Sequence, residues 1–186
     1  MALVTAPIWL VVAVLVHIFL GRPVLFTQAR AGLKGTPFRV FKFRSMTNET
    51  DTAGNLLSDE RRLNKFGRFL RSTSLDELPQ LINVIRGKLS VVGPRPLLLA
   101  YVDRYSPQQR RRLDVVPGIT GWAQVNGRNA IGWEERFSLD TWYVDHQALL
   151  VDLRILWLTL VRVISPKGIN ASGNVTMTEF MGAEKQ

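Results

Sequence analysis

Two adjacent carboxylates, Asp76 and Glu77, lie between basic parts of the sequence and are the residues best suited to chemistry. One carboxylate oxygen can attack phosphorus, while the neighbouring carboxylate holds a metal ion or a proton. A structural account also exists, because Ser74 and Glu77 have the spacing of a helix capping box. A helix that begins at Asp76 would instead use Asp76 as its cap and place Pro79 in the tolerated first turn. From these residues alone, capping explains Asp76 as well as catalysis does.

Three arginines beside constrained backbone are candidates for binding an anionic substrate. Arg95 lies between two prolines in the segment 93–96, so its backbone is fixed before a ligand arrives. Arg128 follows an Asn-Gly pair that favours a tight turn, and Arg71 precedes the segment with the two carboxylates. Guanidinium groups bind phosphate oxygens in pairs. The three arginines therefore form a candidate set for a diphosphate.

Short strands and turns are expected to carry these residues. Alternation and turn residues predict strands at Val24–Gln28 and Phe38–Arg44, joined by a turn at Gly32–Pro37. Leu89–Val92 is predicted to be a further strand that leads into the segment of Arg95. Pro117–Trp122 is predicted to be a second rigid turn.

Two helical segments have the composition of helices that lie on an anionic membrane. Arg61–Arg71 carries five cations and no acid, interleaved with apolar residues at helical spacing. A cationic surface helix that packs on its own core is the alternative. Leu149–Ile164 is mostly aliphatic and holds a tryptophan and two arginines. The run Arg110–Arg112 is predicted to be a solvated or lipid-facing basic face, and the tail after Pro166 is predicted to be loosely ordered.

The first part of the chain differs in composition from the rest. Residues 2–20 are nearly all apolar, which is close to the ~20 residues that a helix needs to cross a bilayer core. We therefore divide the 186 residues into a membrane helix at 1–22 and a catalytic domain at 23–186. The predicted fold is mixed α/β, with a membrane-embedded helix and a small globular domain of short strands and interfacial amphipathic helices.

Charge and composition restrict the partner and the chemistry. With 24 Lys and Arg against 15 Asp and Glu, the net charge of +9 favours an anionic partner. The sequence has no cysteine, which excludes a thiolate metal site, a cysteine nucleophile and a disulfide.

Several ordered motifs together resemble one known family. An apolar segment that contains a proline is followed by four motifs: Phe-Lys-Phe-Arg-Ser-Met at 41–46, Arg-Ser-x-x-Leu-Asp-Glu-Leu-Pro-Gln at 71–80, Gly-Pro-Arg-Pro at 93–96 and Pro-Gly-Ile-Thr-Gly at 117–121. In this combination the chain resembles the bacterial sugar transferases, and it is most similar to the small monotopic phosphoglycosyl transferases. The resemblance extends from Pro7 to about Glu179.

The resemblance implies a two-step reaction. The Asp76 carboxylate would attack the β-phosphorus of a UDP-sugar and release UMP, and polyprenyl phosphate would then attack the aspartyl-linked phosphosugar. The family also implies Mg²⁺ bound by Asp76 and Glu77, with Glu77 as metal ligand or proton handler. A metal ion suits this chemistry because the diphosphate charge must be neutralised when a carboxylate approaches. The predicted phosphate-binding residues are Arg71, Arg95, Arg128, Lys42 and Arg44.

The same resemblance implies a location and a route for the substrates. The catalytic domain is expected on the cytoplasmic face of the bacterial inner membrane, in contact with anionic lipid, at the first membrane step of glycan assembly. Pro7 would break the membrane helix, and with six residues before it, segment 1–22 would be the second part of a re-entrant hairpin. The UDP-sugar is expected to be N-acetylated. Three tryptophans could stack on it or pack in the core: Trp122, Trp133 and Trp142.

Two interpretations of a different class use the same composition. A membrane-tethered nucleic-acid binder would explain the basic charge and the aromatic residues, but the sequence contains no recognised nucleic-acid motif, so we expect no nucleic acid among the partners. A non-catalytic membrane-surface protein would use the same helices, but it leaves Asp76, Glu77 and Arg95 unexplained.

Overall fold

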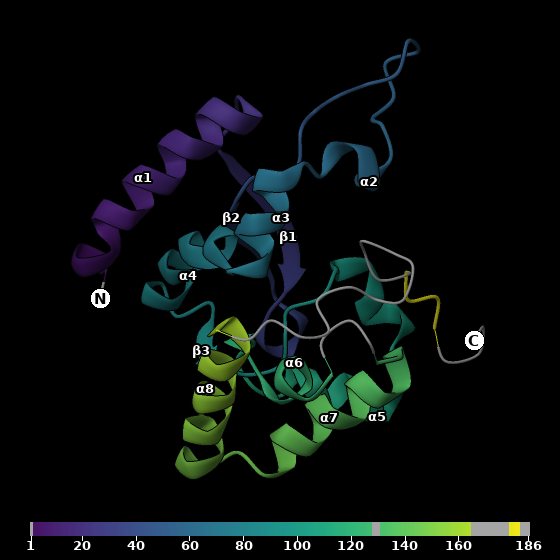
Figure 1. Ribbon diagram of the computed structural model, residues 1–186. Coiled ribbons are helices and arrows are strands. Elements are labelled where there is room, and N and C mark those ends of the chain that lie inside the picture. Colours follow the sequence, from purple (N-terminus) through teal and green to yellow (C-terminus); the bar gives the residue numbers. More distant parts are fainter. Residues whose placement is uncertain (1, 128–130, 165–178, 183–186) are drawn as a thin grey trace. The chain divides into compact units, whose positions relative to one another are not determined.

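The computed structural model describes residues 2–127, 131–164 and 179–182 (Figure 1). Two compact units are present: unit 1 is Met1–Thr27 with Phe41–Ile82, and unit 2 is Gln28–Val40 with Asn83–Gln186. The chain leaves unit 1 within strand β1 (Leu25–Ala31), returns within β2 (Pro37–Phe43) and leaves again within helix α4 (Leu81–Ile85). Helices and short strands are both present, which confirms the predicted mixed α/β class. Each unit is described by itself.

Unit 1 is built around helix α1 (Ala2–Leu20). Every fourth residue at the end of α1 is buried, so these side chains lie on one face of the helix. This face packs on side chains from β2, from helix α3 (Lys65–Ser72) and from the 3₁₀ helix η2 (Leu75–Gln80). The buried residues of this core are Val12, Val16, Leu20, Phe43 and Leu70.

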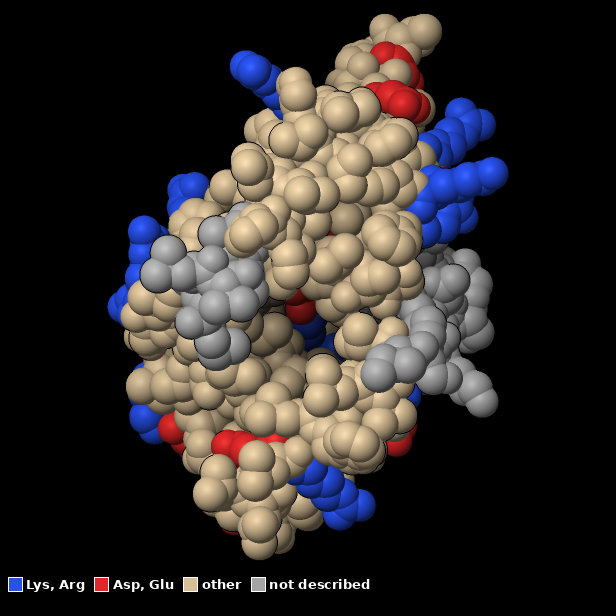
Figure 2. All heavy atoms as spheres, turned by 60° about the vertical axis from the view of Figure 1, so that its left-hand side comes forward, with Lys and Arg blue, Asp and Glu red and all other residues tan. Residues whose placement is uncertain are grey.

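The opposite face of α1 is apolar and exposed. Figure 2, in which the left-hand side of Figure 1 faces the reader, shows almost no charged side chain over this helix. Among the helices in the described part of the chain, none has both the length and the hydrophobicity required to span a membrane. Helix α1 continues through Pro7 without interruption, and its re-entrant insertion stays a prediction. The large exposed side chains of this face are Ile8, Leu10, Val11, Val14, Ile18 and Phe19.

The basic segment that we predicted as one helix is divided into two. Helix α2 covers Asp59–Arg62, and α3 begins after a break at Leu63 and Asn64. The side chain of Asn64 accepts a hydrogen bond from the N–H of Gly67 at 2.8 Å, which caps the new helix. A capping residue in the middle of the periodic pattern therefore ends one helix and begins the next.

The segment that carries the two carboxylates does not start as either capping model predicted. Ser74 has a left-handed backbone (φ 57°) and its side chain makes no capping hydrogen bond, so the proposed capping box with Glu77 is wrong. The helix that follows is a 3₁₀ helix, η2, which already begins at Leu75, so Asp76 is its second residue. Asp76 is consequently not the residue that precedes this helix, and the capping explanation of its identity fails.

Unit 2 contains a two-stranded parallel sheet of β3 (Ser90–Val92) and β4 (Gly118–Thr120). Ser90 pairs with Gly118, and Val92 pairs with Thr120. Strand β3 confirms the strand predicted at its position, whereas β4 lies inside Pro117–Trp122, which we predicted only as a turn. Gly and Pro indicate a turn from the local sequence alone. The segment forms a strand because it pairs with β3, which is remote in the sequence.

Unit 2 also contains helices, of which α8 (Leu149–Ile164) packs against both strands of this sheet. They are η1 (Leu33–Gly35), η3 (Leu99–Arg104), α5 (Pro107–Arg110), η4 (Arg111–Leu113), α6 (Trp122–Asn126), α7 (Trp133–Asp145) and α8. The bounds of α8 are those predicted from its aliphatic pattern. One core lies around Phe137 and Phe180, and another around Tyr143 and Ile155. The tail predicted after Pro166 lies outside the described residues until Glu179.

Candidate active site

The carboxylate pair lies in η2 of unit 1. Asp76 is 8 % exposed, and Pro79 and Gln80 of the same helix are also buried, so this helix is embedded rather than attached to the surface. The left-handed residue Ser74 turns the chain sharply out of α3, and its carbonyl accepts a hydrogen bond from the N–H of Glu77 at 3.1 Å. This turn places both carboxylates in the first turn of η2.

A lysine from β2 contacts the second carboxylate. Lys42 Nζ lies 2.7 Å from Glu77 Oε1, and the two side chains are 20 % and 16 % exposed. Neighbouring Phe43 is buried in the core of unit 1, and because side chains alternate along a strand, Lys42 points to the other face of β2. Lys42 and Glu77 were both predicted site residues, and the structure brings them together.

Arg71 is fixed beside the carboxylates through the segment at Ser45. Its Nε donates a hydrogen bond to Ser45 Oγ at 2.9 Å. Burial lowers the pKa of Arg71, and the negative charge of Asp76 opposes this shift, so the two groups interact electrostatically. Gly67 allows α3 to approach Ser45, since a Cβ at this position would lie 2.0 Å from the Ser45 carbonyl oxygen. These contacts hold Arg71 near the carboxylate segment, and its binding of substrate phosphate stays a prediction.

Arg44 has a different environment from the other predicted phosphate ligands. Its guanidinium donates to the carbonyl of Arg22 at 3.0 Å and to the carbonyl of Leu20, the last residue of α1. Burial lowers the pKa of Arg44. A cation at the carbonyl end of a helix is favourable, so these contacts hold α1 to the end of β2. Phosphate binding by Arg44 stays a prediction.

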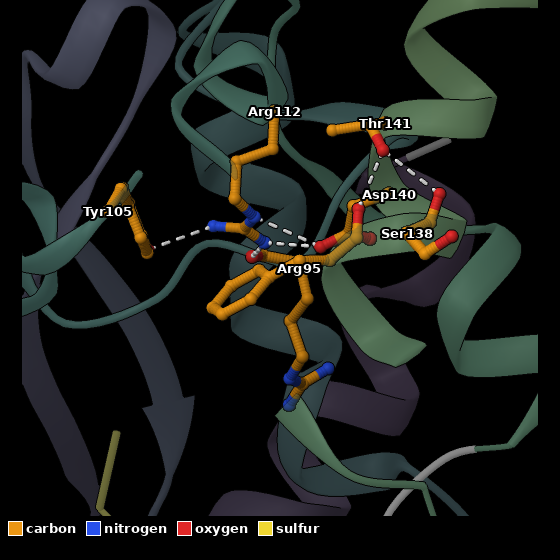
Figure 3. A network of polar contacts seen from close by, with 7 residues as sticks. Arg95, Tyr105, Arg112, Ser138, Asp140 and Thr141 are labelled. Carbon is orange, nitrogen blue, oxygen red and sulfur yellow. Dashed lines mark hydrogen bonds and ion pairs between the residues drawn. The ribbon is translucent and has the colours of Figure 1, made fainter. Parts of the chain in front are cut away.

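Arg95 belongs to unit 2, where the backbone around it is held at three consecutive residues. The N–H of Gly93 donates to the Thr120 carbonyl at 2.9 Å, and the Pro94 carbonyl accepts from Gly118 N–H at 3.0 Å. The Arg95 carbonyl accepts from Arg112 Nη2 at 2.6 Å (Figure 3). These three hydrogen bonds constrain the backbone of the segment, while the binding of phosphate by Arg95 stays a prediction. Arg128, the remaining predicted phosphate ligand, lies outside the described residues.

The structure corrects the prediction for the arginine run 110–112. Arg112 is 3 % exposed, and its guanidinium forms two hydrogen bonds with Asp140 Oδ2 at 2.8 and 3.0 Å. Arg111 pairs with Asp145 on the surface, and Arg110 is exposed. Only part of the run is therefore a solvated basic face. The third arginine enters the interior because Asp140, from α7, neutralises its charge there.

A second buried arginine adds positive charge near this pair. Arg136, on α7, is 6 % exposed and lies over the ring of Trp133, with its Cζ 5.5 Å from the ring centroid. Burial lowers the pKa of Arg136 to about 10; Asp140 opposes this shift, and Arg95 and Arg112 strengthen it. Arg112 and Arg136 thus both act electrostatically on one buried carboxylate, Asp140, and the charge of Arg95 acts on Arg136. Such an imbalance favours the binding of an anion.

The tryptophans that we considered for sugar stacking have separate environments. Trp133 is buried in the core with Tyr101, Phe137 and Phe180, which confirms core packing as its use. Trp122 stacks on Trp142 with ring centroids 4.8 Å apart. Arg154 of α8 lies over Trp122, 5.4 Å from its ring centroid. This second group links α6, α7 and α8.

Metal binding by Asp76 and Glu77 stays a prediction, and it would require substrate oxygens to complete the site. Among the residues that the structure describes, no group of three or more His, Cys, Asp or Glu could hold a metal ion. Asp76 and Glu77 supply two adjacent carboxylates in η2. Mg²⁺ is commonly bound by one or two carboxylates together with substrate phosphates and water, so the residues present fit this ion.

Comparison with known proteins identifies the family. The model of the bacterial sugar transferases matches residues 1–166. The chain belongs to the bacterial sugar transferase family. It is 53 % identical over 179 residues to the uncharacterized sugar transferase EpsL of Bacillus subtilis (strain 168), with 96 % of this chain and 89 % of that protein covered. As a bacterial sugar transferase, the chain is a transferase.

Two further relatives carry names that state a reaction. A UDP-glucose:undecaprenyl-phosphate glucose-1-phosphate transferase of Xanthomonas campestris pv. campestris is 42 % identical, over 87 % of this chain. An undecaprenyl-phosphate galactose phosphotransferase of Salmonella typhimurium is 37 % identical, over 80 % of this chain. This sugar transferase spans 36 % and 35 % of the length of these two relatives.

The buried pair of unit 2 does not follow from the sequence patterns used above, which give no role to Asp140 and predict Arg112 on a basic surface. A signal existed in the helix 133–145, where Trp133, Phe137 and Thr141 recur at helical spacing and Arg136 and Asp140 fall on the same buried stripe. A charged residue on an apolar stripe indicates a buried partner.

Proposed function

We propose that this chain transfers a sugar 1-phosphate from a UDP-sugar to polyprenyl phosphate and releases UMP. Asp76 acts as the nucleophile, and the transfer takes place in two steps at the cytoplasmic face of the bacterial inner membrane. Family membership and the names of the relatives support the reaction class. Because those names include both glucose and galactose, the identity of the sugar, N-acetylated or not, is part of what the experiment below decides.

The environment of Asp76 in unit 1 carries this proposal. Its carboxylate is nearly buried, and it interacts electrostatically with Arg71, which Ser45 holds in place. The neighbouring acid, Glu77, is paired with Lys42. A diphosphate that approaches two free carboxylates would be repelled, whereas here a cation accompanies each of them. This arrangement differs from that of a helix cap, which needs neither cation.

The proposed chemistry consists of two displacements at one phosphorus atom. In the first, a carboxylate oxygen of Asp76 forms a bond to the β-phosphorus, and the bond from this phosphorus to the bridging oxygen breaks, so UMP leaves with the bonding electrons. In the second, an oxygen of polyprenyl phosphate attacks the same phosphorus, and the carboxylate of Asp76 is released. The polyprenyl phosphate is already ionised near neutral pH, so no strong general base is required.

Positive charge must accompany both displacements. We propose that Arg71, Lys42 and Arg95 each hold phosphate oxygens of a substrate. Mg²⁺ bound by the carboxylates of Asp76 and Glu77 would neutralise charge on the diphosphate. Magnesium is therefore part of the proposal.

The membrane partner is proposed from two apolar surfaces. One is the exposed face of α1, and the other is a face of α8 on which Leu149, Leu150, Leu153 and Trp157 are more than half exposed. Exposed apolar surface of this extent marks an interaction site, and the acceptor lipid resides in a membrane. The net charge of +9 favours a surface of anionic lipid.

A half-reaction tests the proposal. The protein is incubated with Mg²⁺ and, in separate samples, UDP-glucose, UDP-galactose or their N-acetylated counterparts, without polyprenyl phosphate. The correct donor should release about one UMP per active site, because an enzyme nucleophile lets the first displacement proceed alone. Mass spectrometry should then show a phosphosugar adduct on the peptide that contains Asp76.

Two substitutions complete this test. Asp76→Asn keeps the size of the side chain and removes the nucleophile, so it should abolish the adduct while the melting temperature changes little. Glu77→Gln should retain donor binding and slow turnover. If Asp76→Asn still formed the adduct, or if UMP appeared only when polyprenyl phosphate was present and no adduct could be trapped, a direct transfer between the two substrates would replace the covalent mechanism.

A further inference from the structure

The buried pair of Arg112 and Asp140 in unit 2 does more than fill the interior. Each side chain is 2 % exposed, and Arg112 bonds Asp140 through both Nε and Nη2. Burial lowers the pKa of Arg112, but the attraction of Asp140, together with Tyr105, more than reverses this shift, and the pKa lies above its ordinary value. The guanidinium is therefore charged and fixed in orientation by a planar, two-point contact.

The fixed guanidinium has two further acceptors, and one of them is a backbone atom. Arg112 Nη2 donates to the carbonyl of Arg95 at 2.6 Å, while Nη1 contacts the hydroxyl of Tyr105 at 3.3 Å. Figure 3 shows the Arg95 side chain extending away from the ion pair, with only its backbone turned toward Arg112. The contact therefore constrains the backbone of Arg95, from which its side chain extends, and does not involve the Arg95 guanidinium.

We propose that Arg112, which two hydrogen bonds hold to Asp140, is a positioning residue. Its bond to the Arg95 carbonyl fixes the backbone orientation from which the Arg95 side chain reaches the substrate phosphate. Strand β4 holds the N–H of Gly93 and the carbonyl of Pro94, whereas the carbonyl of Arg95, which is bonded directly to the Cα that bears the side chain, is held by Arg112. Pro94 and Pro96 restrict the backbone on either side of Arg95, and Arg112 selects one orientation of the peptide group that joins Arg95 to Pro96. This inference rests on the proposed function, in which Arg95 holds phosphate oxygens.

A double-mutant cycle tests whether Arg112 acts through Arg95. Arg112→Lys keeps the positive charge beside Asp140, but an ammonium lacks the planar fork that reaches Asp140 and the Arg95 carbonyl together. With the correct UDP-sugar, the donor KM in the UMP-release assay should rise roughly ten-fold to a hundred-fold, because a misplaced binding group costs that much. In an Arg95→Ala background the same change should have almost no further effect.

Matched variants separate positioning from loss of stability. Tyr105→Phe removes the other contact of the Arg112 guanidinium but leaves the one to Arg95, so its donor KM should remain close to that of the original protein. If Arg112→Lys does not fold, the pair Arg112→Gln with Asp140→Asn replaces the buried charges with a neutral hydrogen-bonded pair, which removes the cost of an unpaired charge. This double variant should show the same rise in donor KM.

The outcomes are distinct. A rise in donor KM that disappears in the Arg95→Ala background supports the inference. Suppose that Arg112→Lys raises the donor KM by the same factor in the Arg95→Ala background as in the original protein, or that Tyr105→Phe raises it as much as Arg112→Lys does. The ion pair then acts on the fold alone, and the inference is overturned while the proposed function stands. If Arg95→Ala leaves donor use unchanged, both the phosphate-binding role of Arg95 and this inference are wrong, whereas the adduct on Asp76 still decides the reaction itself.

Discussion

Replacing Lys42 with methionine should destabilise the protein, because the ion pair that this change removes is largely buried. Lys42 Nζ and Glu77 Oε1 are 2.7 Å apart, and both side chains are about four-fifths buried. At this distance and an effective dielectric constant of ~20, the attraction is about 6 kcal/mol, most of which is offset by desolvation. The substitution leaves a carboxylate without its cation in a partly buried position, which costs about 1–3 kcal/mol. The melting temperature should fall by ~2–10 °C.

Lys34→Met provides the matched control. Lys34 Nζ lies at the same distance, 2.7 Å, from Asp114 Oδ1, but these side chains are 68 % and 45 % exposed. Water and salt screen such a pair, so its loss should cost no more than ~1 kcal/mol and should vanish in 1 M NaCl. The assay is thermal unfolding of both variants at low and high salt. If both melting temperatures fell equally, and both losses vanished in salt, the pair at Glu77 would not be desolvated and our reasoning about the site would be refuted.

Three further predictions follow from other contacts. Gly67→Ala should destabilise the protein by roughly 1–3 kcal/mol in thermal unfolding, because its Cβ would lie 2.0 Å from the Ser45 carbonyl oxygen, whereas Gly132→Ala, with no atom within 4 Å, should be close to neutral. Burial disfavours the charged form of Arg136 in the folded state, where its pKa is lowered to about 10. Below that pH the charged side chain therefore lowers the free energy of unfolding, and this destabilisation is relieved as the pH rises above about 10. Arg136→Met should therefore raise the melting temperature at pH 7 and reduce this pH dependence. A lower melting temperature at pH 7 would show instead that the arginine stabilises the fold. Trp157→Gln should weaken binding to anionic vesicles in a flotation assay without a change in melting temperature, because the side chain is 66 % exposed.

The parts of the fold that the sequence predicts well are those set by local patterns. The helix at Leu149–Ile164 was predicted with its observed bounds, since an aliphatic run of this length has few alternatives. The two strands around Gly32–Pro37 were also expected, although their ends differ by one to three residues. Local patterns misled us where a side chain changed the backbone, as Asn64 did by capping a new helix.

The parts that escaped prediction depend on partners far apart in the sequence. Periodicity alone does not indicate which arginine of 110–112 is buried, because the answer lies in Asp140, 28 residues beyond Arg112. Lys42 and Glu77 are separated by 35 positions, and although the adjacent carboxylates made Glu77 a candidate, no local signal indicated that Lys42 would pair with it. Strand β4 was missed for the same reason, since its pairing partner β3 lies outside its own segment.

The distribution of charge within unit 2 is itself an argument for an anionic ligand there. Arg112 and Arg136 act on a single buried carboxylate, Asp140, to which Arg112 already donates two hydrogen bonds at Oδ2, and the charge of Arg95 disfavours that of Arg136. A second buried cation next to that pair lowers stability, and a fold with no ligand would gain by replacing it with an apolar residue. Its cost is offset when a phosphate group binds, since the anion restores the balance of charge. If unit 2 does receive phosphate, UDP should raise the melting temperature of the original protein more than that of Arg136→Met, whereas uridine should shift neither.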